Sequence, residues 1–155
     1  AKMTLLGVPD RPGVSALLFE SLAHANVNVD MIVQNTSIDG STDISFTLPL
    51  GDIATALPIL KKVGDEVGAK GVSQDENIVK LSLVGAGMKS SPGIAAKMFR
   101  VLADNDVNIE MISTSTIRIS VVVERSKLET AIRALHTAFD LDSGQDYSAP
   151  LPERK

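Results

Sequence analysis

Cysteine is absent from this 155-residue chain, which excludes a disulfide framework, a zinc–thiolate site and a catalytic thiol. That absence fits a reducing cytoplasm, where we expect the protein. No apolar run reaches the roughly 18 residues of a membrane-spanning helix, and the opening AKMTLLGVPD is not a secretory signal. We therefore expect no membrane contact. The chain begins with Ala1 and not with Met, which indicates a processed or shortened chain.

Positive charge is also scarce, because the formal net charge is −4 and no basic run occurs. A phosphate backbone would find little to bind, so nucleic acid is not an expected partner. Aromatic residues make up only 3% of the chain. Phe46 alternates in register with Ile44 and Leu48, and Phe19 and Phe99 recur at helical spacing. All three are expected in the core and not in a base-stacking platform.

Signals for catalysis or metal binding are weak. The stretch VGAGMKSSPG has Ser90 where a dinucleotide fingerprint needs Gly, and it lacks the Gly-Lys-Ser/Thr of a Walker loop. His24 and His136 have no Cys, second His or carboxylate at ligand spacing, so we assign both a structural role. We therefore expect no catalytic residue, no metal site and no cofactor in this chain.

What the sequence does contain is a duplication. Between residues 12–32 and 92–112, ten of 21 positions are identical. NVNVDMIVQN in the first copy answers DVNIEMISTS in the second, with Asp30 opposite Glu110. Two copies are too few for a solenoid, so we expect two small similar domains.

Each copy has the pattern strand, helix, strand, strand, helix. In the first helix, Ala16, Phe19, Leu22 and Ala23 form the predicted apolar face. Val29, Met31 and Val33 then alternate with Asp30, Ile32 and Gln34, the period of two that a strand has. Asp39-Gly40 is a hairpin signal.

Two features set the expected starts of the second helices. Pro58 would destabilise a helix interior by roughly 3 kcal/mol, so we start that helix near Thr55, with Pro58 in its first turn. Ser126 and Glu129 have the spacing of a capping box at the start of the corresponding helix of the second copy.

A fourth strand, KGVSQD, closes the first copy, whereas the second copy shows none. The missing strand comes from chain upstream of Ala1, from the other half, or from a partner. The fold class is α+β: two tandem ferredoxin-like (βαββαβ) domains, each an antiparallel sheet with both helices on one face. We place the domains at 1–76 and 77–141, with 142–155 as a flexible tail.

The duplicated element predicts a ligand site. A helix N-terminus offers unpaired N–H groups and partial positive charge, so Gly13–Ser15 can seat a small anion such as an α-carboxylate. In this topology the second strand lies at the sheet edge beside that helix, where Asn28, Asp30 and Gln34 can meet the ligand's ammonium group and side chain. The residues alone equally allow that Pro-Gly only starts a helix and that Asn28 only turns the chain.

Several motifs together resemble the C-terminal regulatory part of aspartate kinase, which is a tandem of ACT domains. They are VDMIVQN, TDISFT, LVGAGMKSSPG, VNIEMISTS, IRISVVV and ALHTAFDL, and the match runs from about Lys2 to Leu141. The resemblance implies a regulatory subunit or excised regulatory region without the kinase domain, so ATP and Mg are expected only in the catalytic part. It implies feedback inhibition of aspartate phosphorylation by threonine, lysine or both. The implied partners are a second copy, paired through ACT edge strands, and an aspartate kinase catalytic domain or α subunit.

Family roles carry over to particular residues. The resemblance implies that Asp10, the backbone of Gly13, Val14 and Ser15, and Gln34 contact the effector, and that a partner copy supplies Asn108 and Ile109. This chain departs from the family at three positions: Ser91 replaces a common His, Thr116 a common Glu, and Ser15 a common Ala. Two alternatives stay open from the sequence, a free-standing ACT sensor of another enzyme and a small acylphosphatase-like enzyme that would use Arg11.

Overall fold

The computed structural model describes residues 1–36, 39–86, 88 and 91–141. Its first unit runs strand, helix, strand, strand, helix, strand. The elements are β1 (Lys2–Pro9), α1 (Val14–His24), β2 (Ile32–Thr36), β3 (Ser41–Thr47), α2 (Ile53–Val67) and β4 (Gly71–Asp75). The four strands pair antiparallel in the order β2-β3-β1-β4, so β2 and β4 are the sheet edges.

The second unit repeats this plan. Its elements are β5 (Ile78–Val84), α3 (Ile94–Asp104), β6 (Met111–Thr114), β7 (Arg118–Glu124) and α4 (Leu128–Ala138). The sheet order β5-β7-β6 matches β1-β3-β2, and no fourth strand pairs with β5 within the described residues. The predicted α+β fold with two tandem ferredoxin-like repeats is confirmed.

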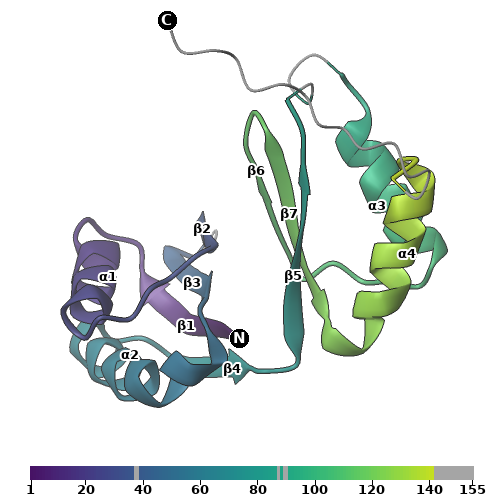
Figure 1. The fold of residues 1–155 in the computed structure, drawn as a ribbon. Helices are drawn as coiled ribbons and strands as arrows, with labels where there is room; N and C mark the ends of the chain where they lie inside the picture. The colour runs from purple at the N-terminus through teal and green to yellow at the C-terminus, as the bar shows by residue number, and fades with distance from the viewer. Residues whose placement is uncertain (37–38, 87, 89–90, 142–155) are drawn as a thin grey trace, which may run out of the picture.

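Each sheet carries its two helices on one face only. Figure 1 shows α1 and α2 on the outer side of the first sheet and α3 and α4 on the outer side of the second. The helix-free faces of the two sheets therefore turn toward each other. This layering leaves both outer strands β2 and β6 beside the boundary between the units.

Alternation along the central strands builds two separate cores under the helices. In the first, Ile44 and Phe46 of β3 pack with Leu18 and Leu22 of α1, and all four are buried. Phe19 is partly buried, and its ring meets Phe46 edge-on at 5.5 Å between centroids. The second core is formed by Met98, Leu102, Val107, Ile119, Val121, Val123, Ala131 and Leu135, with Phe99 partly buried against it.

Details of the first helix differ from the prediction. The buried residues of α1 are Val14, Leu18 and Leu22, whereas Ala23 is exposed. The core therefore follows the i, i+4, i+8 row, so that of the predicted face Leu22 is fully buried and Phe19 partly buried, whereas Ala16 and Ala23 are exposed. Recurrence between the copies therefore identified only part of the buried face, because burial is decided by which row of the helix faces the sheet.

The predicted start of α2 near Thr55 is wrong. The helix begins at Ile53 after a 3₁₀ turn at Leu50–Asp52, and Pro58 lies inside it. Pro58 is exposed, so the helix lacks one hydrogen bond only on its solvent side, where water can reach the carbonyl of Ala54. Burial of Ala56, Leu60 and Val63 on the opposite side holds the helix together.

The predicted capping box is also wrong. Ser126 lies in a 3₁₀ turn at Arg125–Lys127, and no side chain among the described residues caps α4. The Ser126 hydroxyl instead donates to the carboxylate of Glu124. The hairpin at Asp39-Gly40 and the strand at Gly71–Asp75 are confirmed, whereas the predicted tail at 142–155 lies outside the described residues.

Candidate functional site

The start of α1 is built by a glycine in a left-handed conformation. Gly13 has φ 94° and is the N-cap, and no side chain caps this helix in the described part of the chain. Its carbonyl accepts from the N–H of Leu17 at 2.9 Å. The N–H groups of the first turn are consequently left to a ligand or to water, with the positive end of the helix dipole behind them.

Ser15 and Gln34 connect this helix start to the edge strand β2. The Ser15 hydroxyl donates to Oε1 of Gln34 at 2.8 Å. The bond occupies the oxygen of the amide and leaves its NH₂ group as a donor. Ser15 thus contributes a contact that orients Gln34, a residue predicted to bind the effector.

Asp10 and Val14 complete the group near the helix start. The N–H of Asp10 donates to the carbonyl of Gly40 at 3.0 Å, which ties the loop after β1 to the β2–β3 hairpin. The Asp10 side chain is exposed, whereas that of Val14 is buried, so Val14 can offer a ligand only its backbone. The structure thus brings Asp10, Gly13, Val14, Ser15 and Gln34 to one end of the first unit.

The equivalent helix start in the second unit has the same backbone and different side chains. Gly93 is the N-cap of α3 with φ 99°. The positions of Ser15 and Gln34 are taken by Ala95 and Thr114, which cannot form the hydroxyl–amide bond. The helix starts at Gly13 and at Gly93, which we call the two half-sites, therefore share a backbone conformation and differ in their side chains.

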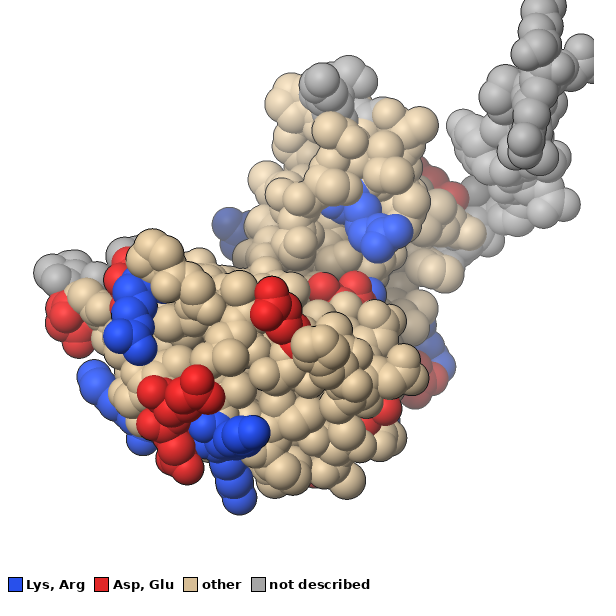
Figure 2. Space-filling model, turned by 90° about the vertical axis from the view of Figure 1, so that its left-hand side faces the viewer, with Lys and Arg blue, Asp and Glu red and all other residues tan. Residues whose placement is uncertain are grey.

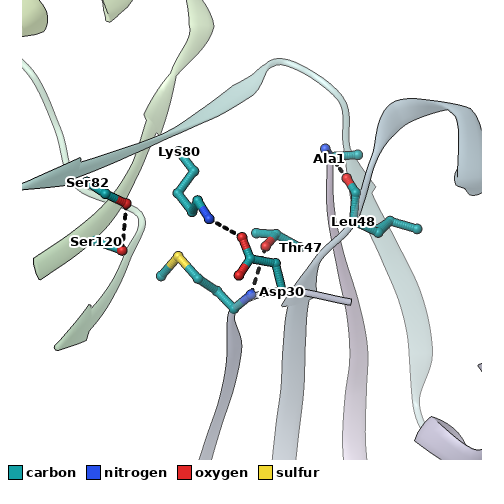
Figure 3. A network of polar contacts seen from close by, with 8 residues as sticks. Ala1, Asp30, Thr47, Leu48, Lys80, Ser82 and Ser120 are labelled. Carbon is teal, nitrogen blue, oxygen red and sulfur yellow. Dashed lines mark hydrogen bonds and ion pairs between the residues drawn. The ribbon is translucent and has the colours of Figure 1, made fainter. Parts of the chain in front are cut away.

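Asn28 and Asp30 lie elsewhere, at the boundary between the units. Both line a cavity of about 380 Å³ together with Thr47, Ile78 and Lys80. Lys80 of β5 reaches across to form an ion pair with the carboxylate of Asp30 (Figure 3). At the rim of the same cavity the Ala1 amino group donates to the carbonyl of Leu48 at 2.8 Å, and burial lowers its pKa.

Asn108 and Ile109 belong to the matching connection of the second unit, between α3 and β6. Asn108 is exposed, and Ile109 packs against the second core. The next residue, Glu110, forms an ion pair with Lys2 of β1. The predicted contact of Asn108 and Ile109 with an effector at the start of α1 depends on a partner copy, because both residues belong to the second unit of their own chain.

Sequence analysis missed Lys2 and Lys80, which hold these two connections. The signal was available: Lys2 and Lys80 occupy the same place in KMTLLG and KLSLVG, six-residue segments of the first strand of each copy. The apolar residues of these strands predict their burial, whereas the ion pairs of the two lysines depend on how the two units pack together.

No group of three or more His, Cys, Asp or Glu side chains in the described ranges could hold a metal ion. Within those same ranges no helix is long and apolar enough to cross a membrane. Figure 2 shows acidic and basic side chains mixed over the face that includes the first unit, without a large area of one sign.

Comparisons with known proteins agree with this architecture. The ACT domain family matches residues 4–63 and 81–139. An aspartokinase of Pseudomonas aeruginosa is 51% identical over 143 residues, which are 92% of this chain and 35% of that protein. The chain thus spans about a third of the length of the curated relatives it matches.

Several solved structures match nearly from end to end. The crystal structure of aspartokinase alpha and beta subunits has a TM-score of 0.83 at 46% identity, covering 90% of this chain and 91% of that one. The ligand-free regulatory subunit of aspartate kinase from Thermus thermophilus has a TM-score of 0.83 at 39% identity, covering 89% and 91%.

Proposed function

Since this chain belongs to the ACT domain family and corresponds to the regulatory part of aspartokinases, we propose that it senses free amino acids. The effectors are threonine, lysine or both, the end products named by the resemblance. The observation that carries the proposal is the uncapped start of α1, with Gly13 at φ 94° and Gln34 held beside it by Ser15.

The chemistry of that place suits an α-amino acid. The N–H groups at the helix start favour a carboxylate, because they are unpaired donors at the positive end of a helix dipole. The exposed carboxylate of Asp10 offers a counter-charge for the ammonium group. Gln34 supplies an amide that can form hydrogen bonds with the effector's side chain.

A second copy of the chain completes the site in this proposal. β2 and β6 are edge strands, with the exposed Ile32 on one and Ile112 on the other. Exposed strand edges favour pairing with another chain. Dimerisation through these edges brings Asn108 and Ile109 of one copy to the helix start of the other.

Effector binding then inhibits an attached catalytic part, which transfers phosphate from ATP to L-aspartate in the first step toward lysine, threonine and methionine. ATP and Mg belong to that catalytic domain or α subunit, in the cytoplasm. A ligand shifts a conformational equilibrium only by its differential affinity for the two states. The coupling free energy between two binding sites is typically about 1–3 kcal/mol, which corresponds to about 5- to 150-fold changes in affinity.

Titration calorimetry of the chain with threonine and with lysine tests this function. We expect saturable binding of at least one of them, accompanied by a shift toward dimer in size-exclusion chromatography. Glycine serves as the control, because it has the same carboxylate and ammonium groups without a side chain. Absence of heat with both effectors at millimolar concentration would reject the proposal.

The two alternatives are separated by further assays. A free-standing sensor of another enzyme predicts binding of the effector but no association with an aspartate kinase catalytic part. An acylphosphatase predicts turnover of an acyl phosphate that is lost in Arg11→Ala. The near end-to-end likeness to the Thermus thermophilus regulatory subunit favours the kinase regulator over both.

A further inference from the structure

The boundary between the two units has its own small apolar centre. Met31, Ile78, Met111 and Val122 are buried there, and Val33 packs against them. Met31 and Met111 are the same residue of the two copies, each directly following an acidic residue. The segment before β2 and the segment before β6 therefore meet at the boundary between the two units.

Two ion pairs cross this boundary in opposite directions. Lys80 of the second unit binds Asp30 of the first, and Lys2 of the first unit binds Glu110 of the second. Since Lys2 corresponds to Lys80 and Asp30 to Glu110, each pair is the copy of the other. Figure 3 shows one of them, with Lys80 pointing from β5 to Asp30.

Backbone contacts join the two ion pairs into a closed ring. The N–H of Asp30 donates to the carbonyl of Thr47 at 2.9 Å, and Thr47 lies opposite Lys2 in the β1–β3 ladder. In the second unit the N–H of Glu110 donates to the carbonyl of Val122 at 2.8 Å. Val122 in turn lies opposite Lys80 in the β5–β7 ladder. The path returns through Lys80 to Asp30.

The same strands run from this ring to the helix starts. β1 begins at Lys2, and the chain that leaves its far end passes through Asp10 into Gly13 and α1. β5 carries Lys80 near its beginning and leads toward Gly93 and α3. Thus β1 and β5 each end near the helix start of their own unit. At its beginning, each of these strands carries the lysine that binds the segment before the edge strand of the other unit.

We propose that Lys2 and Lys80 are positioning residues that couple the two half-sites of one chain. Lys2 sets the placement of Asn108–Glu110, and Lys80 sets that of Asn28–Asp30, so a ligand that moves one connection shifts the opposite first strand and its helix start. This inference rests on the proposed function, because it concerns how the same effector sites communicate. It adds residues outside the site that control effector affinity.

A charge swap on the Lys2–Glu110 pair tests the coupling without altering a predicted effector contact. Lys2→Glu and Glu110→Lys each place like charges together, and the double variant restores the pair with its signs exchanged. Arg133→Glu is the matched control for Lys2→Glu, since it also replaces the cation of an ion pair by a carboxylate, on the exposed side of α4. Each variant is measured as the full 155-residue chain.

Two readouts are compared. Calorimetry gives the affinity for threonine and for lysine. Pulsed electron paramagnetic resonance gives the distance between nitroxides at Lys62→Cys of α2 and Thr130→Cys of α4, which are exposed positions in helices of different units. The labels are site-specific because the chain has no cysteine of its own.

We expect each single variant to weaken effector binding about two- to fivefold, in line with the strength of a partly exposed ion pair. We also expect it to broaden the distance distribution, while the double variant regains most of both and Arg133→Glu changes neither. Unchanged affinity and distance in Lys2→Glu would overturn the inference while leaving the proposed function intact. If the parent chain binds neither amino acid, the proposed function fails and the affinity coupling with it. In that case an unchanged distance distribution would also refute the positioning role.

Discussion

The hydroxyl of Ser15 donates a 2.8 Å hydrogen bond to Oε1 of Gln34 and so links the first turn of α1 to the edge strand β2. The contact has no equivalent in the second unit, where Ala95 and Thr114 stand at these positions. Because this contact orients Gln34 before a ligand arrives, we expect the effector to bind more tightly at the start of α1 than at the start of α3.

Ser15→Ala should weaken effector binding about two- to fivefold, because Gln34 then has to be ordered by the ligand instead of by the helix. Calorimetry with threonine and lysine measures the change. Ser21→Ala is the control on the same helix, since the Ser21 hydroxyl only donates back to the carbonyl of Leu17 at 2.7 Å. Equal affinities in the two variants would argue against an orienting role of Ser15.

Gln34→Ala and Asn108→Ala should each weaken effector binding about tenfold, because each removes an amide proposed to contact the ligand. Both side chains are exposed, so thermal unfolding is expected to stay within a few degrees of the parent chain. Gln74→Ala is the control, an exposed glutamine on β4. A lowered unfolding temperature with unchanged affinity would make both residues structural.

Gly13→Ala should lower the free energy of unfolding by about 1–2 kcal/mol, because φ 94° is strained for a residue with a Cβ. Space is not the obstacle, since a Cβ at Gly13 meets no atom of the described residues within 4 Å. Gly51→Ala is the matched control, with the same open surroundings and no positive φ. Equal urea midpoints for the two variants would refute the strain argument.

Pro58→Ala should raise the free energy of unfolding by about 1–2 kcal/mol. The alanine restores an N–H to the exposed side of α2, and part of that gain is offset by the greater freedom of the unfolded chain. Chemical denaturation measures the difference. A destabilised variant would mean that the ring of Pro58 contributes packing that outweighs the missing hydrogen bond.

Much of the fold was predictable because the duplication and the alternation of apolar and polar residues are both visible in short segments of the sequence. Ile44 and Phe46 alternate with polar residues and are buried, and Asp39-Gly40 turns the hairpin as expected. The start of α2 was missed because propensity disfavours Pro58 inside a helix, whereas burial of Leu60 and Val63 on the other side decides the outcome. Tertiary packing outweighed a local preference.

The candidate site was predictable only in part. The predicted closeness of the helix start to the edge strand is seen in the contact between Ser15 and Gln34, because it follows from the topology, whereas the contacts of Asp10, Gly13, Ser15 and Gln34 with an effector stay a prediction. The sequence could not place Asp30, whose partner Lys80 lies fifty residues away in the other unit. How two repeats pack against each other depends on contacts such as those of Met31 and Met111, which no local pattern specifies.

The most direct test is a backbone NMR titration of this 16.4 kDa chain with threonine and with lysine. Our account predicts that the amide signals of Val14 and Ser15 and the side-chain amide of Gln34 shift saturably with at least one of them, at the affinity found by calorimetry. Signals that stay in place at the start of α1, with both amino acids in large excess, would contradict it.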